Sequence, residues 1–345
     1  MAARRALITG IYGQDAAYLA QFLLHRGYEV FGSHRRGSSR ASWRLEELNV
    51  EKDVRLVELE LLEMGNILRV LKDTQPDEIY NLAAQSFVGV SFKQPLYTSE
   101  VDGLAVTRLL EVVREVNPQI RFYQASTSEM FGRVVESPQT ERTPFAPRSP
   151  YGISKLYAHW MVRNYREAHG MHTTSGILFN HESPLRSREF VTRKITSALA
   201  EIKNNKQDVL ELGNLGARRD WGHARDYVAG MHAMVRLDTP NDYVLATGRA
   251  YSVEDFVNTA ARVAGFHLAW EGEGQARHAV DRGTGRLIVR VNPNYFRPAE
   301  VEDLVGDASR AAADLGWRSR TSFEDLVQEM MERDLARVRD GCVLL

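Results

Sequence analysis

The chain has almost no cysteine, and this scarcity excludes several classes of site. Its only cysteine among 345 residues, Cys342, lies near the C-terminus. A single thiol cannot form an intramolecular disulfide, and it cannot build a cysteine metal cluster. The sequence therefore predicts no metal site, and a reducing compartment is the default expectation.

Long apolar runs and basic tracts are also missing. No run of about 18 apolar residues could span a bilayer. The first strand that we expect begins at Arg5, which leaves no room for the apolar region of a secretory signal. The formal net charge is −1, and no long basic tail stands out. We therefore expect a cytoplasmic protein without a membrane or nucleic-acid partner.

A glycine-containing turn is the first feature that is present. Residues 5–9 read as a buried strand, residues 10–16 as a tight turn, and residues 17–26 as an amphipathic helix. Gly10 and Gly13 let the backbone approach a pyrophosphate, and the helix that follows points free N–H groups at the anion. An ordinary glycine turn is the alternative. The strand, turn and helix in this order favour a dinucleotide site.

The second expected strand, residues 28–33, indicates which dinucleotide is bound. NAD sites usually end this strand with a carboxylate for the ribose 2′-hydroxyl, whereas NADP sites place arginine near the 2′-phosphate. Here the strand runs into His34, Arg35, Arg36, Gly37 and Ser38, and none of these is acidic. Guanidinium and hydroxyl groups suit a phosphate dianion, so NADP is favoured. The competing interpretation is an exposed basic loop.

Strand and helix patterns alternate through the next part of the chain. Further strands are expected at 54–59, 78–82, 121–125 and 173–179, with helices at 64–73 and 96–115. This alternation predicts an α/β protein with a Rossmann-type, doubly wound parallel sheet. Beyond residue 180, polar loops around 180–184, 213–222 and 292–300 indicate a smaller lobe. We expect residues 1–179, with a return near 223–250, to form the nucleotide lobe, and residues 180–222 and 251–345 to form the smaller lobe.

Tyr151 and Lys155 are the strongest catalytic candidates. A spacing of four places both side chains on one face of a helix. A nearby ammonium lowers the pKa of a phenol, which is about 10 in water, and this favours a general base. Alone, the pair could be a solvated lysine beside a packed tyrosine. Thr127, Ser128 and Glu129 follow the expected strand at 121–125, at the strand end where open α/β sheets bind ligands.

Five short motifs carry a resemblance that covers nearly the whole chain. They are Tyr-Asn-Leu-Ala-Ala-Gln-Ser at 80–86, Arg-Ser-Pro-Tyr-Gly at 148–152, Phe-Asn-His-Glu-Ser-Pro at 179–184, Arg-Asp-Trp-Gly at 219–222 and Phe-Arg-Pro-Ala-Glu at 296–300. With the glycine turn, these segments resemble the extended short-chain dehydrogenase/reductase superfamily. Within it they most resemble the GDP-mannose 4,6-dehydratase family.

The resemblance implies a reaction and a role for each catalytic candidate. Tyr151 with Lys155 would remove the O4 proton of GDP-D-mannose while the C4 hydride passes to NADP. The resulting ketone acidifies C5, where Glu129 would act as base and help to expel the C6 hydroxyl as water. Thr127 and Ser128 would bind the sugar near O4 and O6. The hydride returns to C6, so the product, GDP-4-keto-6-deoxy-D-mannose, forms without net redox change and enters deoxysugar biosynthesis.

The resemblance also implies the binding residues. The residues expected to line NADP are Gly10, Gly13, Gln14, Asp15, Arg35, Arg36, Ser38, Glu60, Leu61, Leu82, Ala83, Ala84, Ser86, Tyr123, Lys155, His181 and Arg186. Those expected to bind the GDP-sugar are Ser86, Glu129, Tyr151, Asn180, Lys194, Gly213, Arg219, Arg297 and Glu300. A homodimer or homotetramer is implied through the Arg35–Arg36 loop and helix faces.

Some positions depart from the family pattern, and other functions stay open. Tyr12, Ala16 and Leu185 stand where Thr, Gly and Arg are common, and Glu60 replaces an aspartate near adenine. A GDP-manno-heptose dehydratase would share every motif. A reductase or epimerase of the same fold would not need Glu129 for C5 deprotonation. A non-catalytic NADP-sensing protein is the alternative from another class, although such proteins usually lose the Tyr/Lys pair.

Overall fold

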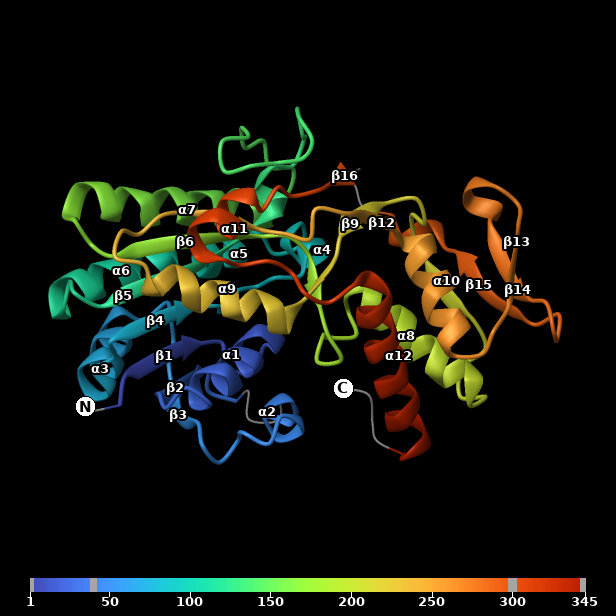
Figure 1. The fold of residues 1–345 in the computed structure, drawn as a ribbon, viewed down its shortest axis with the longest axis horizontal. Helices are drawn as coiled ribbons and strands as arrows, with labels where there is room; N and C mark the ends of the chain where they lie inside the picture. Colours follow the sequence, from blue (N-terminus) through green and yellow to red (C-terminus); the bar gives the residue numbers. More distant parts are fainter. Residues whose placement is uncertain (1–2, 38–41, 297–302, 342–345) are drawn as a thin grey trace.

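The computed structural model describes residues 3–37, 42–296 and 303–341 (Figure 1). Ser38, Arg297, Glu300 and Cys342 lie outside the described residues. Within the described part of the chain, no helix is both long and apolar enough to cross a bilayer. The same part contains no group of three or more His, Cys, Asp or Glu side chains that could hold a metal ion.

A seven-stranded sheet forms the centre of the larger lobe, and every neighbouring pair of strands is parallel. Across the sheet the strands are β11 (Tyr243–Leu245), β6 (Thr173–Leu178), β5 (Arg121–Thr127), β4 (Glu78–Asn81), β1 (Arg5–Thr9), β2 (Glu29–His34) and β3 (Arg55–Glu58). Central strands of such a sheet are covered on both faces. Their sequences are therefore continuous apolar runs, without alternation of apolar and polar residues. All six residues of β6 are buried. The predicted doubly wound α/β sheet is confirmed.

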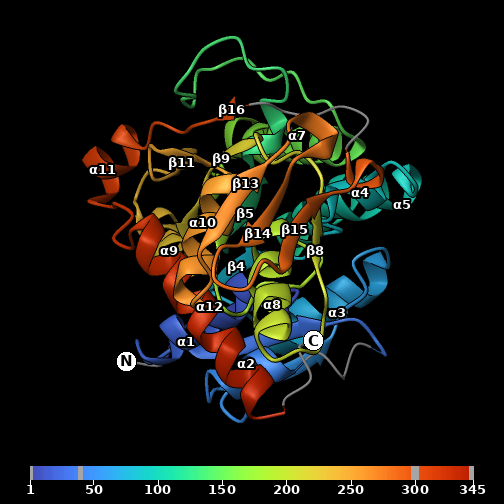
Figure 2. The same ribbon diagram turned by 90° about the vertical axis from the view of Figure 1, so that its right-hand side faces the viewer.

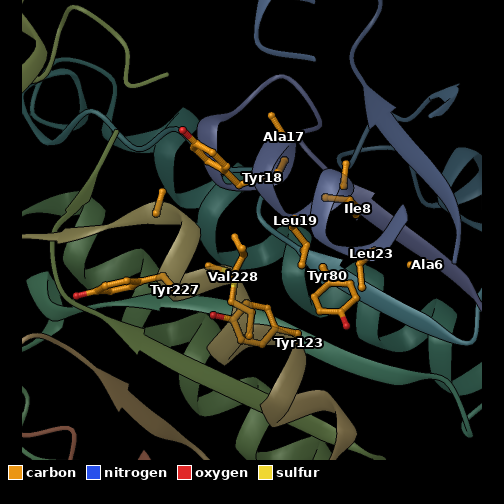
Figure 3. Packing of buried hydrophobic residues seen from close by; sticks show 14 of the residues in the cluster. Ala6, Ile8, Ala17, Tyr18, Leu19, Leu23, Tyr80, Tyr123, Tyr227 and Val228 are labelled. Atoms are coloured by element: carbon orange, nitrogen blue, oxygen red, sulfur yellow. The ribbon is translucent and has the colours of Figure 1, made fainter. Parts of the chain in front are cut away.

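Helices cover both faces of this sheet. On one face lie α1 (Gln14–Leu24) and α9 (Ala224–Arg236), and on the other α3 (Met64–Thr74), α6 (Ala105–Val116) and α7 (Pro150–His169). Figure 3 shows the first face, where Leu19 and Leu23 of α1 and Val228 of α9 pack beside Ile8 and Tyr80. Each fully buried side chain of this size contributes about 1.5–3 kcal/mol.

The strand order reverses between β1 and β4, and polar side chains bond neighbouring strands at this point. Thr9 Oγ1 donates to Asn81 Oδ1 at 2.7 Å, and Asn81 Nδ2 donates to Gln124 Oε1 at 2.8 Å. All three residues are buried. Ligands of open α/β sheets bind in the crevice outside the strand ends at such a reversal. These bonds therefore fix the positions of β1, β4 and β5 relative to one another at the strand ends where a ligand is expected.

The segment expected as one helix at 96–115 is three consecutive pieces. They are α5 (Pro95–Ser99), a π-helical turn η2 (Glu100–Leu104) and α6. A π turn inserts one extra residue into a helix and is frequent at functional sites. The remaining short helices are α2 (Trp43–Glu47), α4 (Val88–Ser91), and the 3₁₀ turns η3 (Ser128–Met130), η4 (Gly274–Ala276) and η5 (Pro293–Tyr295).

The smaller lobe has its own core (Figure 2). Helices α8 (Val191–Lys203), α10 (Val253–Val263) and α12 (Phe323–Arg339) pack with a sheet of β13 (Leu268–Glu271), β14 (His278–Asp281), β15 (Leu287–Val291) and β8 (Leu210–Leu212). Two of the regions expected as polar loops, 180–184 and 213–222, contain short strands. In them, β7 (His181–Glu182) pairs with β10 (Gly222–His223), and β9 (Arg218–Asp220) lies between β12 (Ala250–Ser252) and β16 (Asp303–Leu304).

One part of the expected smaller lobe packs elsewhere. Ala311, in α11 (Ser309–Leu315), and Trp317 are buried in the core of the larger lobe. The indole Nε1 of Trp317 donates to the carbonyl of Asp226 at 2.8 Å, which joins this segment to α9. The boundary placed at residue 251 is therefore wrong for residues 308–317, because their apolar side chains cover α9 and β11.

Candidate active site

The glycine turn after β1 forms a close-packed cradle. Gly10 has φ +71°, and a Cβ built on it would lie 2.9 Å from Ala83 Cα. Gly13 donates its N–H to the Gly10 carbonyl at 2.9 Å and precedes the first residue of α1. Only glycine fits both the left-handed backbone and the contact at position 10. The turn therefore has the form required for a pyrophosphate at a helix N-terminus.

The start of α1 is bonded to the segment that follows β6. Gln14 Nε2 donates to the His181 carbonyl at 2.8 Å, and Ser183 Oγ donates to Gln14 Oε1 at 2.8 Å. His181 Nε2 lies 2.7 Å from Asp15 Oδ2, while its Nδ1 lies 2.7 Å from the Phe179 carbonyl. Burial alone would lower the pKa of His181, but the Asp15 carboxylate outweighs it and raises this pKa. The structure thus brings Gln14, Asp15 and His181 together.

Arginine side chains of α2 and of the start of α8 also stabilise the glycine turn. Arg44 donates to the carbonyls of Tyr12 and Leu185, at 2.9 and 2.6 Å. The guanidiniums of Arg44, Arg193 and Arg337 lie 4.4, 5.9 and 5.4 Å from the ring centroid of Trp43. Burial and the neighbouring arginines lower the pKa of Arg44 to about 10. This arginine cluster links the glycine turn to α8 and α12.

The residues expected near the adenosine lie at the ends of β2 and β3. Arg35 and Arg36 are exposed just after β2, and Arg35 Nη1 donates to the hydroxyl of Tyr97. Glu60 accepts the N–H of Leu62 at 3.2 Å, and Leu61 is buried. Arg35 and Arg36 therefore lie at the sheet edge that could receive a 2′-phosphate.

The end of β4 brings small residues to the crevice. Thr9 Oγ1 accepts the N–H groups of Leu82 and Ala83, each at 3.0 Å. Ala84 is partly buried and Ser86 is exposed. Tyr123 is not brought to this crevice. It is fully buried beside Tyr80 (Figure 3), with its hydroxyl under Gly176 of β6, because it points into the core before β5 ends.

The three residues after Ala125 and Ser126 are shaped by a side-chain cap. Thr127 Oγ1 accepts the N–H of Glu129 at 3.2 Å and so begins the 3₁₀ turn η3. Ser128 is buried, whereas Thr127 and Glu129 are partly exposed. The cap holds Thr127 and Glu129 at the carboxyl end of β5, beside the start of α7.

Helix α7 carries Tyr151 and Lys155 at its first turns, and both are buried, 8% and 3% exposed. Ser149 caps the helix by accepting the Gly152 N–H at 3.0 Å, and Pro150 is its first residue. Lys155 Nζ donates to the Ala125 carbonyl at 3.1 Å and lies 5.9 Å from the Tyr151 ring centroid. The Thr127 side chain faces the Tyr151 hydroxyl and acts to lower its pKa. The predicted constellation is therefore assembled.

The electrostatics of the pair differ from the sequence-based expectation. Burial, then the Asp102 carboxylate, raises the pKa of Tyr151, and the Thr127 bond opposes this rise. Burial lowers the pKa of Lys155, and Asp102 opposes that fall. The expectation that Lys155 lowers the pKa of Tyr151 below its ordinary value was wrong for the protein without ligands, because desolvation disfavours the phenolate more strongly.

Two of the residues expected to bind the nucleotide sugar, Lys194 and Gly213, meet at Tyr295 of η5. Lys194 Nζ lies 3.6 Å from the ring centroid of Tyr295, and a Cβ on Gly213 would lie 2.7 Å from the Tyr295 carbonyl. Arg219 is buried in β9, and Asn180 is partly exposed after β6. The sequence analysis missed Tyr295, although it follows Asn292 and Pro293 directly before the Phe-Arg-Pro-Ala-Glu motif.

Arg186 lies between these two groups. Its Nε forms an ion pair with Glu182 Oε2 at 3.0 Å, and its guanidinium lies 3.5 Å from the Phe190 ring centroid. The ring of Phe190 meets that of Phe87, after β4, at 5.9 Å. Arg186 also acts electrostatically on Tyr151 and Asp15. It is therefore the cation that reaches both the catalytic pair and the start of α1.

Comparisons with known proteins agree with this geometry. The sequence profile described as GDP-mannose 4,6 dehydratase matches residues 7–330. A GDP-mannose 4,6-dehydratase of Sinorhizobium fredii (strain HH103) is 52% identical over 341 residues, covering 97% of each chain. The GDP-mannose 4,6 dehydratase of Homo sapiens is 46% identical over 342 residues, covering 97% of this chain and 92% of the relative.

Solved structures show the same fold at lower identity. DesIV, a dTDP-glucose 4,6-dehydratase from Streptomyces venezuelae solved with NAD and TYD bound, has a TM-score of 0.81 at 20% identity, covering 98% and 99% of the two chains. RMD from Pseudomonas aeruginosa, complexed with NADPH, has a TM-score of 0.76 at 19% identity, covering 97% and 100%.

The parallel sheet and the glycine cradle define a Rossmann-type α/β protein with the fold of these solved structures, and the Tyr151–Lys155 pair is buried at the start of α7. The profile match over most of the chain and relatives near 50% identity narrow the class further. The chain belongs to the GDP-mannose 4,6-dehydratase family.

Proposed function

We propose that this chain is a hydro-lyase that converts GDP-D-mannose to GDP-4-keto-6-deoxy-D-mannose in an internal redox cycle with NADP. The substrate and the loss of water rest on its family and on the activity for which relatives such as those of S. fredii and Homo sapiens are named. The observation that carries the proposal is the assembly of Thr127, Glu129, Tyr151 and Lys155 at one strand end beside the glycine turn.

The residues present fit a dinucleotide. The Gly10–Gly13 cradle leaves no room for a Cβ at position 10. The free N–H groups at the start of α1 point toward the place where the pyrophosphate would lie. Arg35 and Arg36 follow β2 without an acidic neighbour, which favours NADP. A bound NADP would supply the hydride acceptor for C4 of the sugar and the hydride donor for C6. The other residues proposed to line it include Gln14, Asp15, Leu82, Ala84, His181 and Arg186.

The chain's own residues supply the proton transfers. Tyr151 removes the O4 proton of the sugar as the C4 hydride leaves, and Lys155 supplies positive charge for the phenolate. Once C4 is a ketone, Glu129 takes the acidified C5 proton and helps the C6 hydroxyl to leave as water. The Thr127 side chain, which acts to lower the Tyr151 pKa, is proposed to donate to the phenolate. Lys194, Arg219 and Asn180 are proposed to hold the GDP portion.

The test is a mass measurement after incubation of the purified protein with GDP-mannose and NADP without added reductant. The expected product is lighter by one water, and the Tyr151→Phe variant should form almost none of it. Conversion of the GDP-manno-heptose analogue with no conversion of GDP-mannose would overturn the substrate assignment. Intact substrate in both incubations would contradict the proposed activity.

We further propose a homodimer built on the outer face of α7. Leu96 of α5, Leu104 of η2 and Ile153 and Tyr157 of α7 are exposed apolar residues, at 82%, 41%, 57% and 40%. Their elements are packed together, since Ser154 bonds Ser99 and a Cβ built on Gly103 would lie 3.3 Å from the Tyr157 ring. An apolar face shared by neighbouring helices marks an interaction surface. A second copy of the chain is the proposed partner.

We also propose a division of labour between the lobes. Residues 1–179 with the return 223–250 would hold NADP, and residues 180–222 with most of 251–345 would hold the GDP-sugar. Two separate hydrophobic cores support this division, together with the positions of Lys194 and Arg219 outside the larger core.

A further inference from the structure

Asp102 is a buried carboxylate that the catalytic scheme does not use. It lies in the π-helical turn η2 and is 1% exposed. Its Oδ1 accepts the N–H of Gln85 at 2.7 Å, and its Oδ2 has no hydrogen-bond partner among the described residues. An ionised carboxylate without a second partner is costly to bury. Its retention at this position therefore requires a compensating charge nearby.

The π turn places Asp102 beside the catalytic helix. Gly103, its neighbour, is packed so closely against α7 that a Cβ there would lie 3.3 Å from the Tyr157 ring and 3.5 Å from the Ser154 carbonyl. Ser99, directly before the turn, accepts the hydroxyl of Ser154 at 3.3 Å. Ser154 adjoins Lys155, so η2 lies against the part of α7 that carries the catalytic ammonium.

The charged groups around the pair single out Asp102. It is the one ionised group that acts on Lys155 among the described residues, and Lys155 is the one that acts on it. Tyr151 is influenced by Asp102, Glu129 and Arg186. Burial raises the pKa of Asp102 to about 6, and Lys155 limits this rise. Asp102 and Lys155 are therefore opposite charges held in one desolvated space.

We propose that Asp102 is the counter-ion of Lys155, and that it acts as a positioning residue for the Tyr151–Lys155 base while anchoring the end of β4 through Gln85. With Asp102 ionised, the buried group of Asp102, Lys155 and neutral Tyr151 carries no net charge. Formation of the phenolate then makes it negative. One carboxylate thus stabilises the ammonium and restrains ionisation of the phenol until a further positive charge enters the site.

The proposal predicts the direction in which the pKa values of Lys155 and Tyr151 change when Asp102 is replaced. Removal of a negative charge makes every nearby group lose its proton more readily, so the pKa values of both Lys155 and Tyr151 should fall when Asp102 is neutralised. Asp102→Asn is the suitable variant, because the amide oxygen can still accept the Gln85 N–H. Glu100→Gln is the matched control. It removes a carboxylate from the same turn, but that side chain is 43% exposed and pairs with Arg108.

The direct test does not depend on turnover. The chain has seven lysines, so its spectrum after isotopic labelling of lysine side chains is simple, and the Lys155 resonance is the one lost in Lys155→Met. In the wild-type protein this resonance should also shift as the pH passes through about 6, where Asp102 titrates. Asp102→Asn should abolish that shift and lower the pKa of Lys155 by about one unit or more. Glu100→Gln should change neither.

Kinetics supply the second readout, which rests on the proposed dehydratase activity. Both limbs of the profile of kcat against pH should move to lower pH in Asp102→Asn by about one unit, with KM changed less than kcat. A Lys155 resonance in the wild-type protein that ignores the titration near pH 6 would overturn the proposal, even if the variant fails to fold. An unchanged Lys155 pKa in folded Asp102→Asn would do the same. Absence of turnover in wild type would instead count against the proposed function.

Discussion

At the residue scale, Glu129 is the carboxylate whose removal should separate the two halves of the reaction. Glu129→Gln keeps the size of the side chain but cannot accept the C5 proton. Product formation should fall about 10²- to 10⁴-fold, the usual contribution of a general base. Oxidation at C4 should persist, because Tyr151 and Lys155 are unchanged.

Rapid-reaction absorbance of NADPH can resolve that first half-reaction in Glu129→Gln, and mass spectrometry can follow the loss of water. Glu136→Gln, which removes a nearby carboxylate outside the catalytic strand end, is the control. Full-rate loss of water in Glu129→Gln would disprove the assigned base.

His181 and Asp15 give a second residue-scale prediction, on stability. The pKa of His181 is raised and that of Asp15 is lowered in the folded protein. The histidine contribution is complete below its ordinary pKa of about 6.5 and is lost as pH rises through the raised value. The aspartate contribution is complete above about 4 and is lost as pH falls through the lowered value.

His181→Gln should therefore destabilise the protein most between about pH 4 and 6.5, by about 2 kcal/mol, and less at alkaline pH. Urea unfolding at several pH values measures this difference. His25→Gln, at an exposed position, controls for the unfolded chain. If the loss of stability in His181→Gln did not vary with pH, His181 and Asp15 would not form a charged pair.

Spacing and context in the sequence indicated Tyr151, Lys155, Thr127 and Glu129 as catalytic candidates, and the structure brings them to the end of β5 and the start of α7. The sequence could not show that Tyr151 is more desolvated than it is stabilised by Lys155. It also placed Tyr123 in the NADP site, whereas the structure buries this side chain in the core, because the last inward-facing residue of β5 cannot be read from a buried strand without alternation. Asp102 was missed, since one acidic residue in a helical pattern normally indicates a solvated face.

At the scale of elements, the β1–α1 turn is the most constrained connection. Gly10→Ala introduces a Cβ at 2.9 Å from Ala83 Cα, at φ +71°. We expect cofactor affinity to fall at least about tenfold, because either the turn or the 82–84 segment must move, and such a displacement costs about 1.4 kcal/mol or more. Titration calorimetry with NADP measures the loss.

Gly27→Ala is the matched control for this turn. Gly27 has a similar φ of +76°, but nothing lies within 4 Å of its added Cβ. It should lose about 1 kcal/mol of stability from backbone strain and bind NADP normally. Equal effects of the two variants on NADP binding would show that strain, not close packing, governs the turn.

Asp334 tests the connection between α12 and α8. Its two oxygens accept from Arg193 Nε at 3.0 and 2.8 Å, and both residues are buried. Asp334→Asn leaves the guanidinium of Arg193 without its counter-charge, so the free energy of unfolding should fall by about 3–5 kcal/mol. Asp340→Asn, at an exposed pair with Arg339, should cost less than about 1 kcal/mol. Urea unfolding compares them.

Element boundaries were predicted to within a few residues where a strand or helix is long and its pattern strong. β1 was predicted in full, and α3 to within one residue at each end. The interruption of the 96–115 helix by η2 was not predictable, because a π turn leaves the residue types of a helix unchanged and depends on packing against α7. The two-residue and three-residue strands near 181, 219 and 222 are too short to carry a period.

At the scale of the whole molecule, the exposed face of α5, η2 and α7 predicts the assembly state. Ile153→Glu places a charge on this face and should convert a dimer to a monomer, since burial of an unpaired charge costs several kcal/mol. Met64→Glu, at another exposed apolar position at the start of α3, should leave the assembly unchanged. Analytical ultracentrifugation distinguishes the two, and a wild-type monomer at all concentrations would refute the proposed interface.

The overall architecture followed from alternation of strands and helices, whereas the path of the last hundred residues did not. The sequence placed 251–345 in one lobe, but Ala311 and Trp317 return to cover α9 and β11. Such long-range returns leave no local pattern, because the apolar residues that cover a distant helix resemble those of any other core.

The bond between Glu47 and the last helix has a consequence for synthesis of the chain. Glu47 accepts hydrogen bonds from Arg333 and Arg337, and Arg337 also bonds the Pro184 carbonyl. The glycine turn and α2 are translated well before α12, whose arginines bond Glu47. We therefore expect polypeptides that are terminated before residue 333 to bind a dinucleotide more weakly than the whole chain does.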